Sequence, residues 1–119
     1  MTKISFKKFS KIDSEKFKSL NLEWLDTYFK VEPIDEIVLN NPEREVIDKG
    51  GFIFMIQKNH NTIGTFAFIK KSAKIYEFSK MAITPDERGN GYGNMAMEFL
   101  IQFAKNKKWS KLILYSNTK

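Results

Sequence analysis

The sequence of 119 residues contains no cysteine and a single histidine, His60. The absence of cysteine excludes disulfides, thiolate zinc sites and cysteine nucleophiles. One histidine cannot form a multi-histidine metal site, so we expect no metal. The unbroken apolar runs are five residues or fewer, too short for a membrane-spanning helix. The first ten residues, MTKISFKKFS, lack the apolar core of a signal peptide. We therefore expect a cytoplasmic protein with no membrane role.

What the chain does have is ordinary globular composition, with 42% apolar and 29% charged residues. Its length predicts one domain, residues 1–119. The net charge of +6 is uneven: residues 1–50 carry nine basic and ten acidic residues, and residues 51–119 carry eleven and four. A basic half favours an anionic partner, such as a phosphorylated cofactor or a nucleic acid, although a lysine-rich solvated surface would look the same.

Hydrophobic periodicity and turn residues predict a mixed α/β sheet. The expected order is β-α-α-β-β-β-α-β. Three consecutive strands should form an antiparallel meander, and the last strand should return parallel to the third of them through a helix. The predicted strands are residues 4–9, 52–58, 62–70, 75–84 and 111–116, and the predicted helices are a segment starting at Asp13 or Ser14, residues 33–40 and residues 91–107.

Aromatic residues alternate along the predicted hairpin. They are Phe52 and Phe54 on one strand and Phe66 and Phe68 on the next. Period-two alternation places them on one face, which is typical of a sheet core. A platform for stacking RNA bases is the alternative that this pattern leaves open.

The sharpest local signal is a glycine-rich segment between a predicted strand and a predicted helix, residues 84–93, TPDERGNGYG. Three alternating glycines allow positive φ angles and a close approach of the backbone to a ligand. Their amides could form an anion-binding nest at the N-terminus of the helix, with Arg88 supplying a charge. The structural alternative is a flexible turn.

Two well-known nucleotide motifs do not fit this segment. A P-loop requires G-x-x-x-x-G-K-[ST], which is absent. A dinucleotide-binding fingerprint requires G-x-G-x-x-G and an acidic residue about twenty positions later. The spacing here is G-x-G-x-G, and no acidic residue follows Glu98.

The segment resembles the R/Q-x-x-G-x-G/A signature of the GNAT superfamily of N-acetyltransferases, through Arg88, Gly91 and Gly93. The flanking residues 77–83, EFSKMAI, are similar to the strand that precedes the signature in one GNAT subgroup. Residues 115–118, YSNT, resemble the strand that follows the signature helix. The close resemblance covers about residues 75–119.

This resemblance implies a GNAT-like acyl-CoA N-acyltransferase fold that takes acetyl-CoA as co-substrate. The third and last strands of the family separate at their ends, and acetyl-CoA enters between them. The strand residues would pair with the pantetheine arm, and the loop amides would hold the pyrophosphate. The cofactor-binding residues implied in this way are Met81, Ala82, Ile83, Arg88, Gly89, Asn90, Gly91, Tyr92, Gly93, Asn94 and Asn117.

Glu77 is the candidate catalytic base. It is the only acidic residue between Asp48 and Asp86, and it lies inside an apolar strand. A lysine-like acceptor amine has a pKa of about 10.4 and must lose a proton before it attacks, which a carboxylate can assist. In the families that the sequence resembles, a glutamate at this strand position often serves as the base. The alternative is an outward-facing glutamate paired with Lys80 or with a lysine of the neighbouring strand.

The chain departs from the resemblance at its end. A GNAT domain continues with a further helix and two strands, so the resemblance implies a C-terminally incomplete domain, and no thiol-protonating residue can be assigned. The helix predicted at residues 91–107 is apolar around most of its circumference, so it needs a second neighbour besides the sheet. This neighbour is either the C-terminal helix that the resemblance implies or a partner chain, in a homo-oligomer formed through this helix and the edge strand. The alternatives to an enzyme acting on an amine are a catalytically weak acyl-CoA-binding module and a basic nucleic-acid-binding domain. The second of these leaves the glycine segment unexplained.

Overall fold

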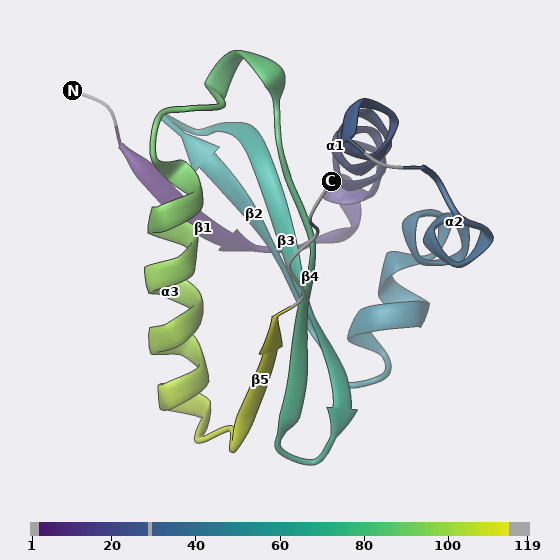
Figure 1. Cartoon of the computed structure of the whole chain (residues 1–119), viewed down its shortest axis with the longest axis vertical. Helices are drawn as coiled ribbons and strands as arrows, with labels where there is room; N and C mark the ends of the chain where they lie inside the picture. Colours follow the sequence, from purple (N-terminus) through teal and green to yellow (C-terminus); the bar gives the residue numbers. More distant parts are fainter. Residues whose placement is uncertain (1–2, 29, 115–119) are drawn as a thin grey trace.

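The computed structural model describes residues 3–28 and 30–114 (Figure 1). Its helices are α1 (Ser14–Tyr28), α2 (Pro33–Asn40) and α3 (Tyr92–Lys107), with the short turns η1 (Lys11–Asp13), η2 (Glu43–Ile47) and η3 (Pro85–Glu87). The strands are β1 (Ile4–Lys8), β2 (Phe52–Lys58), β3 (Asn61–Ser72), β4 (Ile75–Ile83) and β5 (Lys111–Leu114). The predicted order of the main elements is confirmed.

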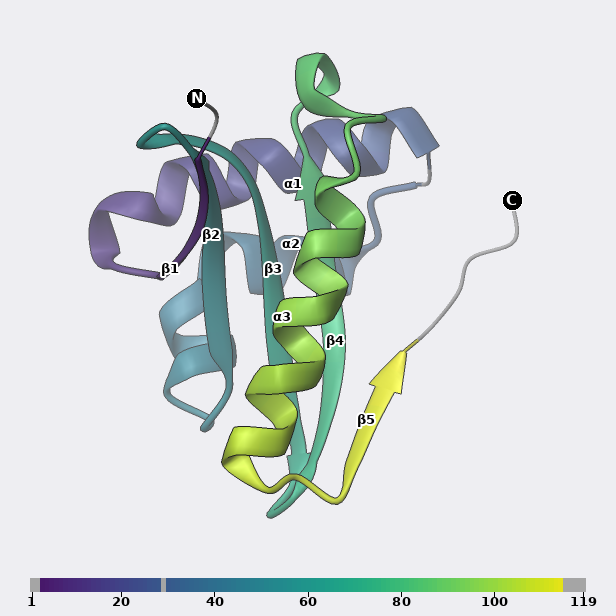
Figure 2. The same cartoon turned by 90° about the vertical axis from the view of Figure 1, so that its left-hand side faces the viewer.

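The strands form one mixed sheet in the order β1-β2-β3-β4-β5. The first four strands pair antiparallel, and β5 pairs parallel to β4 after the α3 crossover, as predicted. Helix α3 covers one face of the sheet, and α1 and α2 cover the other (Figures 1 and 2). The result is a three-layer arrangement in which both faces of β3 are buried.

Strands β1 and β4 and helix α3 differ from the sequence prediction by one residue at one end. Strand β3 extends to Ser72, because its pairing with β4 continues to the tight turn before Ile75. Residues 43–47, for which the sequence predicted no helix or strand, form the π-helical turn η2, which the burial of Val46 stabilises. The last strand was predicted to reach Ser116, but residues 115 and 116 lie outside the described part of the chain.

The core under α3 is aromatic. Phe54, Phe66 and Phe68 are buried on the sheet, and Phe99 and Phe103 of α3 pack against them with ring centroids 4.9–6.0 Å apart. Phe52 is partly buried and packs against the same cluster. The alternating stripe of the hairpin is therefore core, as predicted.

The core on the opposite face is mainly aliphatic. Its buried members come from α1, α2, η2 and the two central strands: Phe17, Val38, Leu39, Val46, Ile53, Met55 and Ala67. One central position there is polar, since the buried hydroxyl of Thr65 donates to the carbonyl of Phe54 at 2.8 Å. The bond satisfies a group that would be costly to bury alone.

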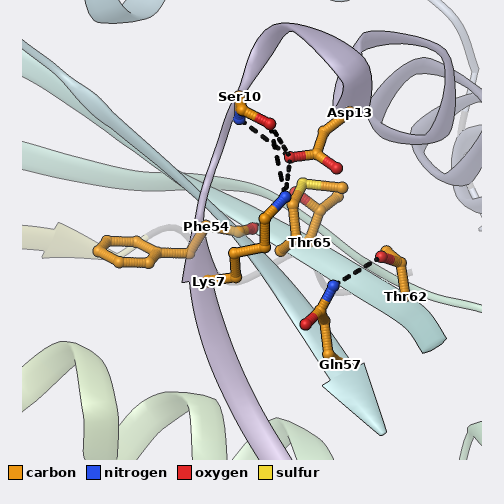
Figure 3. Close-up of polar contacts among 8 residues, drawn as sticks. Lys7, Ser10, Asp13, Phe54, Gln57, Thr62 and Thr65 are labelled. Carbon is orange, nitrogen blue, oxygen red and sulfur yellow. Dashed lines mark hydrogen bonds and ion pairs between the residues drawn. The ribbon is translucent and has the colours of Figure 1, made fainter. Parts of the chain in front are cut away.

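The junction between β1 and α1 is fixed by one carboxylate. The backbone N–H of Ser10 donates to Oδ2 of Asp13 at 2.9 Å, and the ammonium of Lys7 lies 2.7 Å from the same oxygen (Figure 3). Burial alone would raise the pKa of Asp13, but the hydrogen bonds from Lys7 and Ser10 and the charge of Lys7 outweigh it and hold the pKa below its ordinary value.

This lowered pKa predicts an acid-sensitive contribution to stability. The contribution should be fully present above about pH 4, the ordinary carboxyl range, and should disappear as the pH falls through the lower folded pKa of Asp13. Asp13→Asn should therefore destabilise the fold at neutral pH and much less at about pH 2.5. Urea unfolding of both proteins at the two pH values measures this difference. An equal difference at both values would contradict the prediction.

Candidate functional site

The candidate site begins with an irregularity in β4. Ala67 of β3 pairs with Ser79, and Thr65 pairs with Ala82, so two residues of β4 lie opposite one residue of β3. This is a β-bulge, and Lys80 within it has a φ of 56°. A side chain in the left-handed region costs about 1–2 kcal/mol, so the surrounding structure must hold this conformation in place.

On its outer side, β4 pairs with β5 along its first four residues. The parallel pairing with β5 runs from Ile75 and Lys111 to Phe78 and Leu114. Among the described residues, no strand pairs with residues 79–83 on this side. Peptide groups at such an edge are available to hydrogen-bond with an extended ligand.

The end of β4 continues into the glycine loop. After the turn η3, the backbone passes through Gly89 and Gly91, with φ values of 82° and 80°, and α3 starts at Tyr92. A Cβ built on either glycine meets no atom within 4 Å, so the outer side of the loop is open. The first amides of a helix have no acceptor within the helix, which makes this loop suitable for a phosphate group. The loop lies at one end of the sheet, above the start of α3 (Figure 2).

The loop is attached to β2 by an ion pair. The ammonium of Lys58 lies 3.0 Å from Oε1 of Glu87, immediately before the signature. The hydrogen bond that Lys58 donates to Glu87 is the main cause that raises the pKa of Lys58. The Asn90 side chain donates to the Glu87 carbonyl at 3.3 Å. These contacts hold the loop close to the end of the β2–β3 hairpin.

Arg88 connects the loop to α1. Its Nε donates to the carbonyl of Ile83 at 2.8 Å, and its Nη2 forms an ion pair with Glu23. Its guanidinium carbon lies 4.8 Å from the centre of the Trp24 ring. The sequence predicts a contact between Arg88 and a phosphate. In this structure the side chain joins the end of β4 to α1, and the phosphate contact stays a prediction.

Glu77 lies beside the point where β4 and β5 stop pairing. Its neighbours across the strands are Ile69 and Ile113, so it faces the side of the sheet covered by α1 and α2. Its carboxylate lies 3.1 Å from the ammonium of Lys71, and its side chain is only 15% exposed. The sequence left two partners open for Glu77, Lys80 and a lysine of the neighbouring strand. The structure has the second of them, Lys71 of β3. Lys80 pairs elsewhere.

The remaining predicted residues follow the path of the strand and the loop. Met81, Ala82 and Ile83 form the end of β4, and Gly93 and Asn94 lie in the first turn of α3. The sulfur-bearing side chain of Met81 approaches Gly93, with its Cε 3.9 Å from a Cβ built there. Asn117 lies outside the described residues.

The ion pair between Lys80 and Asp35 of α2 is one of the contacts at the site that sequence reasoning missed, as are those of Glu87 with Lys58 and of Arg88 with Glu23. Nζ and Oδ1 are 2.6 Å apart. Burial would raise the pKa of Asp35, but the hydrogen bond and charge of Lys80, together with the N–H of Glu32, lower it. A signal was present in the sequence: Lys80 breaks the alternation of Tyr76 and Phe78, which predicts a bulge.

The described residues contain neither a cluster of metal ligands nor a membrane-spanning helix. No group of three histidine, aspartate or glutamate side chains lies close enough to hold a metal ion within residues 3–28 and 30–114. In the same part of the chain, no helix combines the length and apolar character needed to cross a membrane.

Comparison with known proteins was made in three ways. Residues 16–119 match the family model described as the acetyltransferase (GNAT) family. No curated protein matches the chain. The solved structures include an acetyltransferase of the GNAT family from Staphylococcus aureus Mu50, with a TM-score of 0.81 at 20% identity, covering 96% of this chain and 73% of that one.

Two further solved structures share the fold. A predicted acetyltransferase from Clostridium acetobutylicum, solved with acetyl-CoA, has a TM-score of 0.74 at 16% identity and covers 98% of this chain and 82% of its own. A ribosomal-protein-alanine N-acetyltransferase from Brucella melitensis biovar Abortus has a TM-score of 0.70 at 16% identity, with coverages of 98% and 81%. These identities show a common fold, and the family follows from the model that matches most of the sequence. The bulged end of β4, the glycine loop and this match lead to one conclusion: the chain belongs to the GNAT family of acetyltransferases.

Proposed function

We propose that this chain transfers the acetyl group of acetyl-CoA to a primary amine of a small molecule, peptide or protein. The observation that carries the proposal is the continuity of two features. The bulged end of β4, residues 79–83, leads directly into the open loop at Gly89 and Gly91. An extended, amide-bearing ligand with a diphosphate at one end matches both features.

The proposed binding mode uses the backbone. The pantetheine arm would lie along Met81, Ala82 and Ile83 as an additional strand, and the pyrophosphate would accept hydrogen bonds from the amides between Gly89 and Asn94. Backbone donors suit this task because glycine leaves no side chain between the amide and the phosphate. The positive charge of residues 51–119 favours the same anionic ligand.

The proposed chemistry is direct attack of the amine on the acetyl carbonyl. Glu77 accepts a proton from the acceptor ammonium, directly or through water, because only the neutral amine is nucleophilic. A C–N bond then forms, the C–S bond breaks, and coenzyme A leaves as a thiolate that takes up a proton. Backbone amides between Met81 and Ile83 would stabilise the negative charge that develops on the carbonyl oxygen.

Two alternatives predict different results. A catalytically weak acyl-CoA-binding module would bind acetyl-CoA without turnover. A nucleic-acid-binding domain would bind DNA or RNA with a steep salt dependence and would show no preference for acetyl-CoA.

The first test of the proposal is binding. Calorimetric titration should show selective binding of acetyl-CoA, with ADP as the control ligand. Gly91→Ala should weaken the binding about tenfold, since the new methyl group occupies the open side of the loop at a positive φ. Gly50→Ala is the matched variant, because Gly50 also has a positive φ of 94° but lies at the opposite end of the sheet. Equal weakening by both variants would contradict the assigned phosphate site.

The second test concerns the base. Glu77→Gln should lower turnover of a good amine acceptor about 100-fold or more while leaving acetyl-CoA affinity within about threefold. Lys71→Gln breaks the same ion pair but keeps the carboxylate, so its turnover should fall much less. Steady-state rates measured across a series of amines check this. Unchanged turnover in Glu77→Gln would remove Glu77 from the mechanism.

The third test concerns association of two copies, which stays a prediction. Exposed apolar side chains lie on α3 and β5: Met97 at 39%, Ile101 at 46% and Leu114 at 50% exposure. Ile101→Lys should shift the protein toward a monomer in sedimentation at high concentration. Ile12→Lys, at a position that is 86% exposed beside β1, is the control and should have no such effect. A monomeric unmodified chain at every concentration would refute the prediction.

A further inference from the structure

Lys80 occupies a position that a regular strand would not tolerate. Tyr76 and Phe78 of β4 both pack into the aromatic cluster under α3. Because side chains of a strand alternate between faces, an uninterrupted β4 would direct Lys80 into the same cluster. An unpaired ammonium among aromatic rings would be strongly unfavourable.

The bulge removes this conflict. With φ at 56°, Lys80 leaves the alternation, and its ammonium reaches the opposite face, where it lies 2.6 Å from Oδ1 of Asp35. Both side chains are only 14% exposed. Nζ donates its hydrogen bond to Asp35 on the first turn of α2.

The bulge also reverses which face of the sheet each later side chain of β4 points to. Met81 packs against the cluster under α3 and Ile83 belongs to it, whereas Ala82 lies opposite Thr65. Without the extra residue each of these side chains would face the other way, since a slip of one residue exchanges the two faces of a strand. The N–H and C=O groups that point to the outer edge of β4 would likewise be exchanged for those that point toward β3.

We propose that Lys80 and Asp35 are positioning residues for acetyl transfer: their ion pair holds the bulge of β4 and thereby sets which peptide groups of Met81–Ile83 face the acetyl-CoA arm. The inference rests on the proposed function for its catalytic meaning. Helix α2 contributes no residue to the predicted cofactor site. The inference gives this helix the role of fixing the strand that binds the cofactor.

The chain contains a matched control for this pair. Asp13 accepts the N–H of the residue three positions earlier and pairs with a strand lysine, Lys7, at 2.7 Å. Asp35 does the same with Glu32 and Lys80. The two ion pairs therefore have the same construction, but only one of them touches β4.

The experiment compares Lys80→Met, Asp35→Asn and Lys80→Arg with Lys7→Met. Two quantities are measured on each full-length protein: the acetyl-CoA dissociation constant, and the cross-strand NOEs that report the pairings of Thr65 with Ala82 and of Ala67 with Ser79. Lys80→Met and Asp35→Asn should weaken the NOEs beyond the bulge and raise the dissociation constant about tenfold, equivalent to the loss of one or two hydrogen bonds. Lys80→Arg keeps the positive charge, so its NOEs and its dissociation constant should match those of the unmodified protein.

Lys7→Met should lower the thermal midpoint while leaving the NOEs and the affinity unchanged. If Lys80→Met does not fold, Asp35→Asn carries the test, because asparagine keeps an acceptor for the Glu32 amide and loses only the charge. The inference is overturned if the two substitutions at Lys80 and Asp35 behave like Lys7→Met. Failure of the unmodified chain to bind acetyl-CoA would refute the proposed function instead, and the NOEs would still decide whether the ion pair holds the bulge.

Discussion

The structure depends on the β-bulge in β4, where two residues of this strand lie opposite one residue of β3. Before the bulge, Tyr76 and Phe78 pack into the aromatic core under α3, and after it Ile83 belongs to the same core. Because a slip of one residue exchanges the two faces of a strand, the bulge decides which side chains and peptide groups at the end of β4 face each side. The end of β4 then leads into the glycine loop, where Gly89 and Gly91 have positive φ values.

The bulged end of β4 and the glycine loop are joined by ion pairs to three other elements. Lys80 of the bulge pairs with α2, Arg88 pairs with Glu23 of α1, and Glu87 pairs with Lys58 of β2. Partly exposed ion pairs contribute little net stability. Their value here is geometric, because they fix the position of a bulged strand and of a loop that is open on its outer side. The stability of the domain comes from the two cores on either side of the sheet.

The accuracy of the sequence-based prediction varied with the kind of signal. Strands β2 and β4 and helix α3 were placed within one residue, because alternating aromatics, Pro85 and the glycines mark their ends. The η2 turn was missed, since its burial depends on Val46 meeting residues far away in the chain. The glycines and Arg88 were selected by their place between a strand and a helix, Glu77 by its isolation in an apolar strand, and all of them by their resemblance to a family motif. These signals name residues but not their partners. The roles assigned to them stay predictions.

The sequence by itself determined the order of the elements, the aromatic core and the phosphate-suited loop. All three follow from local periodicity and from residues with restricted or permissive backbones. Only the tertiary structure decided the partners of the charged side chains: Lys71 for Glu77, α1 for Arg88, and Asp35 for Lys80 across 45 positions. The residues next to a charged side chain in the sequence do not indicate which opposite charge it will contact in the fold. That choice is made when the helices pack on the sheet and the cost of burying an unpaired charge selects among the arrangements.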